Sequence, residues 1–274
     1  MAKTKVLITV KTYPTLSAKY DELVCTAGFT ESGEFIRIYP VPFRKNSYEQ
    51  QYKKYEWIEL DLVKNTGDFR PESYKPTSFN DNIRRLEKVD TSHNWAKRKK
   101  IVLNNVYSDL SLLIEEAKNK EICTSLAVFK PTKIKEFVIE TVDREWSKKK
   151  IDTLLASKTQ GVLFEHPENP FEIVKKLPYK FSYKFEDSEG RESKMMIEDW
   201  ELGALYWKAL ARYGGDEHEA TQYVKKQYFD NFVKTKDLYL FLGTTKEHHG
   251  RKAKNPFIII GVFYPKIDNQ INLF

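Results

Sequence analysis

Residues 24–44, which read VCTAGFTESGEFIRIYPVPFR, constrain the fold most strongly because they have the pattern of a β-hairpin. An apolar run leads into a turn at residues 31–33, and a second run of alternating side chains ends at two prolines. Side chains alternate between the two faces of a strand, so Phe35, Arg37 and Tyr39 should share one face. The sequence therefore predicts a hairpin whose second strand carries a cation between two aromatic rings.

This row of side chains has two interpretations. Aromatic rings stack on nucleobases and cations neutralise phosphates, so an exposed row would bind nucleic acid, with Arg44 as a further contact just beyond it. Alternatively, Phe35 and Tyr39 pack beneath a short helix predicted over residues 46–55, and Arg37 pairs with a carboxylate. The sequence leaves both interpretations open.

Strand patterns and helix patterns alternate along the rest of the chain. Apolar and alternating runs predict strands at 6–10, 57–62, 121–129, 133–142, 180–185, 238–242 and 257–264. Helical spacing predicts helices at 95–104, 109–118, 146–157, 199–213 and 217–232. Short strands with helices between them suit small barrels or sandwiches better than a parallel βαβ sheet. We therefore predict a β-rich α+β chain with two small barrels of the oligonucleotide-binding (OB) type, or sandwiches, with inserted helices.

The segment 166–170 is the best candidate for a linker, because two prolines lie there among polar residues. It predicts an N-terminal β-rich unit of residues 1–165 with a helical insertion. The C-terminal β-rich unit would comprise residues 166–274 and contain a pair of helices.

The charge is compatible with a polyanionic partner. The chain has 46 Lys and Arg against 39 Asp and Glu, a net charge of +7 that solubility alone also explains. A basic cluster at residues 97–100 follows Trp95, and we predict phosphate contacts at Lys97 and Arg98. A cluster at residues 251–254 precedes an aromatic residue and adds Arg251. The alternative for each cluster is a solvated surface.

The second unit contains another alternating aromatic strand at residues 180–185. We predict that Tyr183 and Lys184 make nucleic-acid contacts there, together with Arg251. Its basic side chains fall on the face opposite the aromatic rings, whereas Arg37 shares a face with Phe35. The first strand is therefore the better candidate surface.

An enzyme is less expected than a binding protein. Asp199 and Glu201 open a predicted helix, where Asp199 suits the N-cap position, and Glu59 and Asp61 lie two apart on a strand. Either pair would serve a metal-dependent nuclease or phosphoesterase, which is the alternative function. The sequence contains no Walker A loop, no G-x-G-x-x-G, no G-x-S-x-G, no H-E-x-x-H and no C-x-x-C. We predict no catalytic residues, metal or cofactor.

The sequence predicts a reduced cytoplasmic protein. It has only two cysteines and no signal peptide, and it has no apolar run of the roughly 18–20 residues that are needed to span a membrane.

Residues 11–44, 179–201 and 237–265 together resemble an uncharacterised bacterial family with a dual OB-barrel architecture, linked to defence and other genetic-conflict systems. This resemblance implies a non-catalytic, nucleic-acid-associated role, as a sensor or accessory subunit. Single-stranded or structured nucleic acid is the expected partner. A protein-interaction subunit that binds no nucleic acid is a further alternative.

Overall fold

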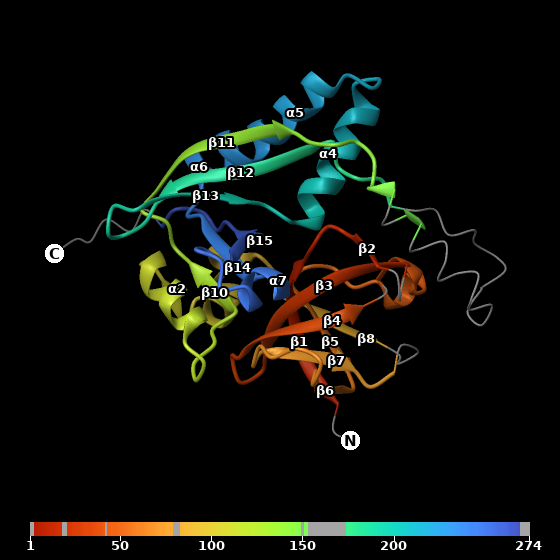
Figure 1. Cartoon of the computed structure of the whole chain (residues 1–274), viewed down its shortest axis with the longest axis vertical. Coiled ribbons are helices and arrows are strands. Elements are labelled where there is room, and N and C mark those ends of the chain that lie inside the picture. Colours follow the sequence, from red (N-terminus) through yellow and green to blue (C-terminus); the bar gives the residue numbers. More distant parts are fainter. Residues whose placement is uncertain are drawn as a thin grey trace.

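The computed structural model describes residues 3–17, 21–41, 43–78, 83–148, 151–152 and 174–268. It confirms the predicted fold class, a β-rich mixture of strands and helices with a curled half-barrel sheet and two smaller sheets. Figure 1 shows the half-barrel at the bottom, the three-stranded sheet with α4 and α5 at the top, and the four-stranded sheet between them. The predicted linker at 166–170 and the domain boundary at 165 lie outside the described residues, so the division stays a prediction.

The half-barrel sheet has the strand order β6-β7-β4-β3-β1-β5-β8, and β2 pairs with β3. Its strands are β1 (Thr4–Lys11), β2 (Thr15–Ser17), β3 (Asp21–Thr30), β4 (Phe35–Val41), β5 (Glu56–Leu60), β6 (Leu62–Lys64), β7 (Ser73–Pro76) and β8 (Arg84–Lys88). The predicted hairpin is present, because β3 and β4 pair antiparallel with Phe29 opposite Phe35. On its other side β4 pairs in parallel with β7, which makes β4 an interior strand.

The other two sheets contain the later strands. The four-stranded sheet has the order β15-β14-β10-β9, and the three-stranded sheet has the order β11-β12-β13. Their strands are β9 (Val106–Tyr107), β10 (Leu126–Phe129), β11 (Lys133–Thr141), β12 (Tyr179–Glu186), β13 (Glu192–Met196), β14 (Tyr239–Thr244) and β15 (Phe257–Phe263). Strands β11 and β12 flank the predicted domain boundary, yet they pair antiparallel along their length.

The helices are α1 (Ser92–Val102), α2 (Leu110–Lys118), α4 (Trp200–Arg212), α5 (Glu217–Lys225), α6 (Phe232–Thr235) and α7 (Lys246–Gly250). A π-helical segment, Lys226–Asn231, joins α5 to α6. Asp199 caps α4 as predicted, since its side chain accepts a hydrogen bond from the backbone N–H of Glu201. The helix predicted over residues 46–55 is wrong, because that stretch holds only the 3-10 turn Tyr48–Gln50. In the described part of the chain, no helix is both long and apolar enough to span a bilayer.

Two of the cores matter for the site. One lies beneath the three-stranded sheet and includes Phe181, Tyr183 and Phe185 of β12. The other joins the half-barrel to the four-stranded sheet, because Phe29 packs in the same cluster as Leu126 and Phe241. This second core fixes the tip of the β3–β4 hairpin against β10 and creates the space described next.

Candidate nucleic-acid groove

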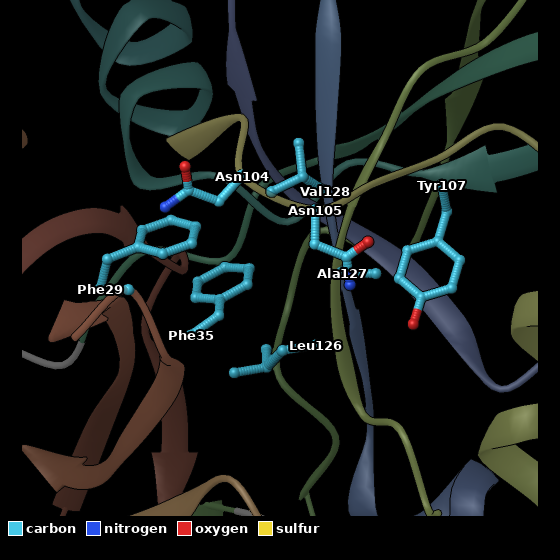
Figure 2. Close-up of a pocket in the computed structure, with 9 residues that line it drawn as sticks. Phe29, Phe35, Asn104, Asn105, Tyr107, Leu126, Ala127 and Val128 are labelled. Atoms are coloured by element: carbon cyan, nitrogen blue, oxygen red, sulfur yellow. The ribbon is translucent and has the colours of Figure 1, made fainter. Parts of the chain in front are cut away.

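Two cavities adjoin at the tip of the β3–β4 hairpin. The first has a volume of about 210 Å³ (Figure 2) and is lined by Phe29, Gly33, Phe35, Asn104, Asn105, Tyr107, Leu126, Ala127 and Val128. The second has a volume of about 640 Å³ and is lined by Thr30, Glu31, Ser32, Gly33, Trp57, Glu87, Lys88, Val89, Asp90, Lys97, Lys100, Ile101 and Asn104. Because both include Gly33 and Asn104, we treat them as one hairpin groove with an aromatic end and a basic end.

Gly33 lies where the two ends meet. The turn is closed by two backbone hydrogen bonds, from Gly33 N–H to Thr30 O at 3.0 Å and from Thr30 N–H to Glu34 O at 2.9 Å. Gly33 has a φ of +86°, which favours glycine, and a Cβ placed there would lie 3.2 Å from Asn104 Nδ2. The absence of a side chain therefore keeps the passage between the two ends open.

Phe35 forms one wall of the aromatic end. Its ring stacks on Phe29 with the centroids 4.4 Å apart and an interplanar angle of 10°, and Phe241 contacts it edge-on at 5.8 Å. Figure 2 shows the Phe29 and Phe35 rings on one side of the cavity, and Asn105 and Tyr107 on the other. The Phe35 ring is half-buried. Its two aromatic neighbours hold one part of it in place, and another part borders the cavity.

Strand β10 and Tyr107 form the rest of the aromatic end. Among the described strands, β9 pairs with β10 only at Val128 and Phe129, so Leu126 and Ala127 have a ladder partner on the β14 side alone. Tyr107 donates a hydrogen bond of 2.8 Å to the Glu116 carboxylate. Burial raises the pKa of Tyr107 and this hydrogen bond raises it further, so the hydroxyl stays protonated at neutral pH.

The basic end combines paired and unpaired charges. Lys97 pairs with Asp90 at 3.1 Å, and Lys5 pairs with Glu31 at 3.3 Å and with Glu87 at 3.4 Å. The carboxylates of Asp90, Glu31 and Glu87 are therefore neutralised by lysines of the same surface.

Lys88 and Lys100 are exposed at the same end. Within the described ranges, neither of them has a carboxylate at ion-pair distance. They are available to bind an anion, and Trp57 lies in the wall beside them.

Two protein families match this chain. Residues 2–104 match a domain of unknown function, DUF8758, and residues 82–274 match a second one, DUF8757. The chain belongs to the DUF8757 family. The hairpin tip lies in the region that matches DUF8758, β9 and β10 lie in the region that matches DUF8757, and α1 lies in both, so residues of both matched regions line the groove.

No curated protein is significantly similar to this DUF8757 chain. A solved structure titled "Structure of murine DNA binding protein bound with ds DNA" aligns with 97% of this chain and 95% of that chain. Its TM-score is 0.32 and its sequence identity is 12%, so the similarity establishes neither a shared fold nor a shared function.

Arg37 does not face solvent, contrary to the exposed row that the hairpin pattern suggests. It is 2% exposed and donates hydrogen bonds to Ser73 Oγ at 3.1 Å, to Ser125 Oγ at 2.9 Å and to Ser125 O at 3.1 Å. Ser125 immediately precedes β10, so the face of β4 that carries Arg37 is covered by the four-stranded sheet. Tyr39, on the same strand, is half-buried, and its carbonyl oxygen accepts a hydrogen bond from Asn65.

Arg98 and Tyr183 are also buried, so the structure corrects their predicted exposure. Arg98 donates to Val89 O at 2.9 and 2.6 Å and lies over the Tyr55 ring, which ties α1 to the half-barrel. Tyr183 points into the core and donates to Tyr228 O at 2.5 Å, because β12 turns its aromatic face inward. Lys184 lies on the outer face and pairs with Glu192 at 3.7 Å.

Of the predicted contacts, the groove brings together only Phe35 and Lys97. Arg44 and Arg251 are exposed but do not line it. Arg251 pairs with Glu247 at 2.7 Å and belongs to a second basic surface, which we call the α7 surface. The α7 surface consists of Lys246, Arg251, Lys252 and Lys254, with the exposed ring of Phe69 against Gly250.

Four residues of the groove were not predicted from the sequence: Lys88, Asn104, Asn105 and Tyr107. Lys100 belongs to the predicted basic cluster at residues 97–100. The available signal was a pair of asparagines, Asn104 and Asn105, at the end of a predicted helix. They line a groove only because the hairpin tip, some seventy residues earlier in the chain, lies beside them.

The carboxylates considered for a metal site have other partners. Both oxygens of Asp199 accept hydrogen bonds from Lys54, at 2.8 and 2.9 Å, and Glu201 lies 3.3 Å from the same ammonium group. Glu59 pairs with Lys3 and Arg84. The described residues contain no group of three His, Cys, Asp or Glu that is placed to hold a metal ion.

Proposed function

We propose that this protein binds single-stranded nucleic acid along the hairpin groove, with a base at the aromatic end and phosphates at the basic end. The observation that carries the proposal is the continuity of the groove. Phe35, Lys88 and Lys100 border cavities that meet at Gly33 and Asn104, and within the described ranges the two lysines have no carboxylate at ion-pair distance.

The chemistry of the two ends supports this division. An aromatic ring stacks on any base with roughly 1–3 kcal/mol per base, and the Phe29 ring holds Phe35 in a fixed orientation. Lysines that contact phosphates release counterions, which makes the affinity depend steeply on salt. A single strand suits the site better than a duplex, because only an unpaired base can turn into a side cavity and stack there.

A non-catalytic sensor or accessory subunit is the role we propose, and the curled, mostly antiparallel half-barrel supports an OB-type barrel for the N-terminal part. A role in bacterial defence, a protein partner and a cytoplasmic location stay predictions from the sequence.

Fluorescence anisotropy with short labelled DNA and RNA strands tests the proposal. We expect micromolar or tighter binding at about 50 mM salt that weakens strongly at about 200 mM, and weaker binding of a duplex of the same length. The double variant Lys88→Ala/Lys100→Ala should bind more weakly. Its plot of log affinity against log salt should be shallower by roughly 0.7 for each phosphate that the variant no longer neutralises.

Two further variants locate the surface. Lys208→Ala/Lys226→Ala removes two exposed lysines from α4 and the π-helical segment, away from the hairpin, and should leave the affinity unchanged. Lys252→Ala/Lys254→Ala removes two cations of the α7 surface and should have little effect. Loss of binding in the α7-surface variant, with full binding by the groove variant, would overturn the groove as the site. Absence of binding to every single strand at low salt would overturn the function.

A further inference from the structure

We infer that the aromatic end of the groove selects one base, and that this base is adenine. The inference rests on the proposed function, since it requires that a strand enters the groove.

The lining of this cavity excludes a phosphate and favours a base. None of its nine lining residues carries a charge, and most of the wall is apolar. A phosphate would lose its hydration there without gaining a cation, which is unfavourable. A flat heterocycle would instead gain contact with the Phe35 ring and with Leu126, which lies below that ring in Figure 2.

Two amide side chains provide the polar contacts of the cavity. Asn104 and Asn105 are both exposed at its mouth, and in Figure 2 Asn105 extends between the phenylalanine pair and Tyr107. Within the part of the chain that the structure describes, the Asn104 amide has no hydrogen-bond partner. An amide has one acceptor and two donors, and a side chain without partners is free to use them on a base edge.

Asn105 lies beside Tyr107 in the lining of the cavity (Figure 2). The Tyr107 hydroxyl donates its proton to the Glu116 carboxylate, so toward Asn105 it can act only as an acceptor. An Asn105 amide that turns an N–H toward this hydroxyl presents its carbonyl oxygen as an acceptor for the exocyclic amine of a base.

Adenine matches this arrangement best. Its N6 amine and N7 form the donor and acceptor pair that an asparagine amide binds with two hydrogen bonds, whereas guanine presents two acceptors on the same edge. Thymine and uracil have a carbonyl in place of the amine. Cytosine has an amine, but its single ring covers less of Phe35 than a purine does.

Anisotropy titrations of short oligoadenylate, oligothymidylate and oligocytidylate at one salt concentration test the inference. We expect oligoadenylate to bind about five-fold more tightly or better. Replacement of adenine by 7-deazaadenine, which lacks N7, should remove most of that preference. The variants Asn104→Ala and Asn105→Ala should each reduce the preference, because they weaken the binding of oligoadenylate more than the binding of oligothymidylate. Gln222→Ala, an exposed amide on α5, is the matched control and should behave as the unmodified protein.

The outcomes separate this inference from the proposed function. Equal affinities for the three strands would overturn adenine selection and leave single-strand binding intact. An adenine preference that survives 7-deazaadenine, or that survives both asparagine variants, would also overturn it. Failure to bind any of the strands would overturn the proposed function itself.

Discussion

The Lys54 ammonium group and the Asp199 carboxylate form an ion pair with distances of 2.8 and 2.9 Å, although their side chains are only 4% and 0% exposed. Lys54 precedes β5 of the half-barrel, and Asp199 caps α4, so the pair joins two distant parts of the chain. Burial alone would lower the pKa of Lys54, but the carboxylates of Asp199 and Glu201 raise it above its usual value. The lysine therefore stays charged at neutral pH.

The variant Lys54→Met should lower the free energy of unfolding by about 3–5 kcal/mol, because it leaves the Asp199 charge buried without a partner. Urea denaturation followed by circular dichroism measures this loss. The double variant Lys54→Met/Asp199→Asn removes the charge and retains a capping side chain, so it should be more stable than Lys54→Met alone. Equal losses in the single and double variants would show that the unpaired charge is not the cause.

Asp68 should make stability depend on pH in the acid range. It accepts hydrogen bonds from Arg70 Nε at 2.9 Å and from Ser73 Oγ at 3.0 Å. Burial alone would raise its pKa, but the contacts with Arg70 lower it from 3.8 to about 2. A carboxyl with a lowered folded-state pKa stabilises the fold fully above its unfolded pKa, and this contribution disappears as the pH falls through the folded value.

Asp68→Asn should therefore cost about 2 kcal/mol at neutral pH and almost nothing near pH 2. Urea denaturation of both proteins across this range checks the prediction. Asp143 is an exposed aspartate without an ion pair in the described structure, so Asp143→Asn is the control. Its effect on the free energy of unfolding should be small and should not change with pH. A cost for Asp68→Asn that does not change with pH would contradict the role of its charge.

Arg37 provides a test between structural and binding roles. Because it is buried and donates three hydrogen bonds, Arg37→Met should lower the free energy of unfolding by about 3 kcal/mol. The folded fraction should keep its affinity for single strands. Arg84→Met, which removes an exposed arginine paired with Glu59 at 3.4 Å, should cost no more than about 1 kcal/mol. A specific loss of nucleic-acid binding at full stability in Arg37→Met would restore the contact first expected from the sequence.

Local signals in the sequence predict most of the long helices and strands but not the short strands β7 and β9. Asp199 caps α4 as its position predicts, and Asp109 caps α2 in the same way, because capping depends on residues two or three apart. The stretch 46–55 fails as a helix because Tyr52 and Lys54 bury their side chains in tertiary contacts, and Tyr55 adopts a φ of 62°. Tertiary packing there overrides local helix propensity.

The site was less predictable, because it depends on contacts that are distant in sequence. Arg37 donates hydrogen bonds to Ser73 and Ser125, which lie 36 and 88 residues away in the sequence. Only the fold reveals that β10 covers this face of β4. The alternation rule placed Phe35 and Arg37 on one face, but it does not say what covers that face. Phe35 keeps one side open only because it lies at the first position of β4, beside the turn at Gly33.

Gly203 should be intolerant of even a methyl group. It lies in α4, and a Cβ built on it would be 2.2 Å from Tyr13 Cδ2 and 2.4 Å from Tyr13 Cε2. The ring cannot easily retreat, because the Tyr13 hydroxyl donates to Lys175 O at 2.7 Å and accepts from Trp207 Nε1 at 2.8 Å. Alanine is favoured over glycine in a helix by about 1 kcal/mol, but the steric overlap should outweigh this.

We therefore expect Gly203→Ala to lower the free energy of unfolding by about 1–3 kcal/mol, as overpacked cores do. The neighbouring Ala204→Gly calibrates helix propensity alone, because Ala204 is exposed in the same helix, and it should cost about 1 kcal/mol. In a Tyr13→Ala background the clash is gone, so Gly203→Ala should become neutral or stabilising. If Gly203→Ala stabilises the unmodified protein, α4 does not pack against Tyr13 as the structure shows.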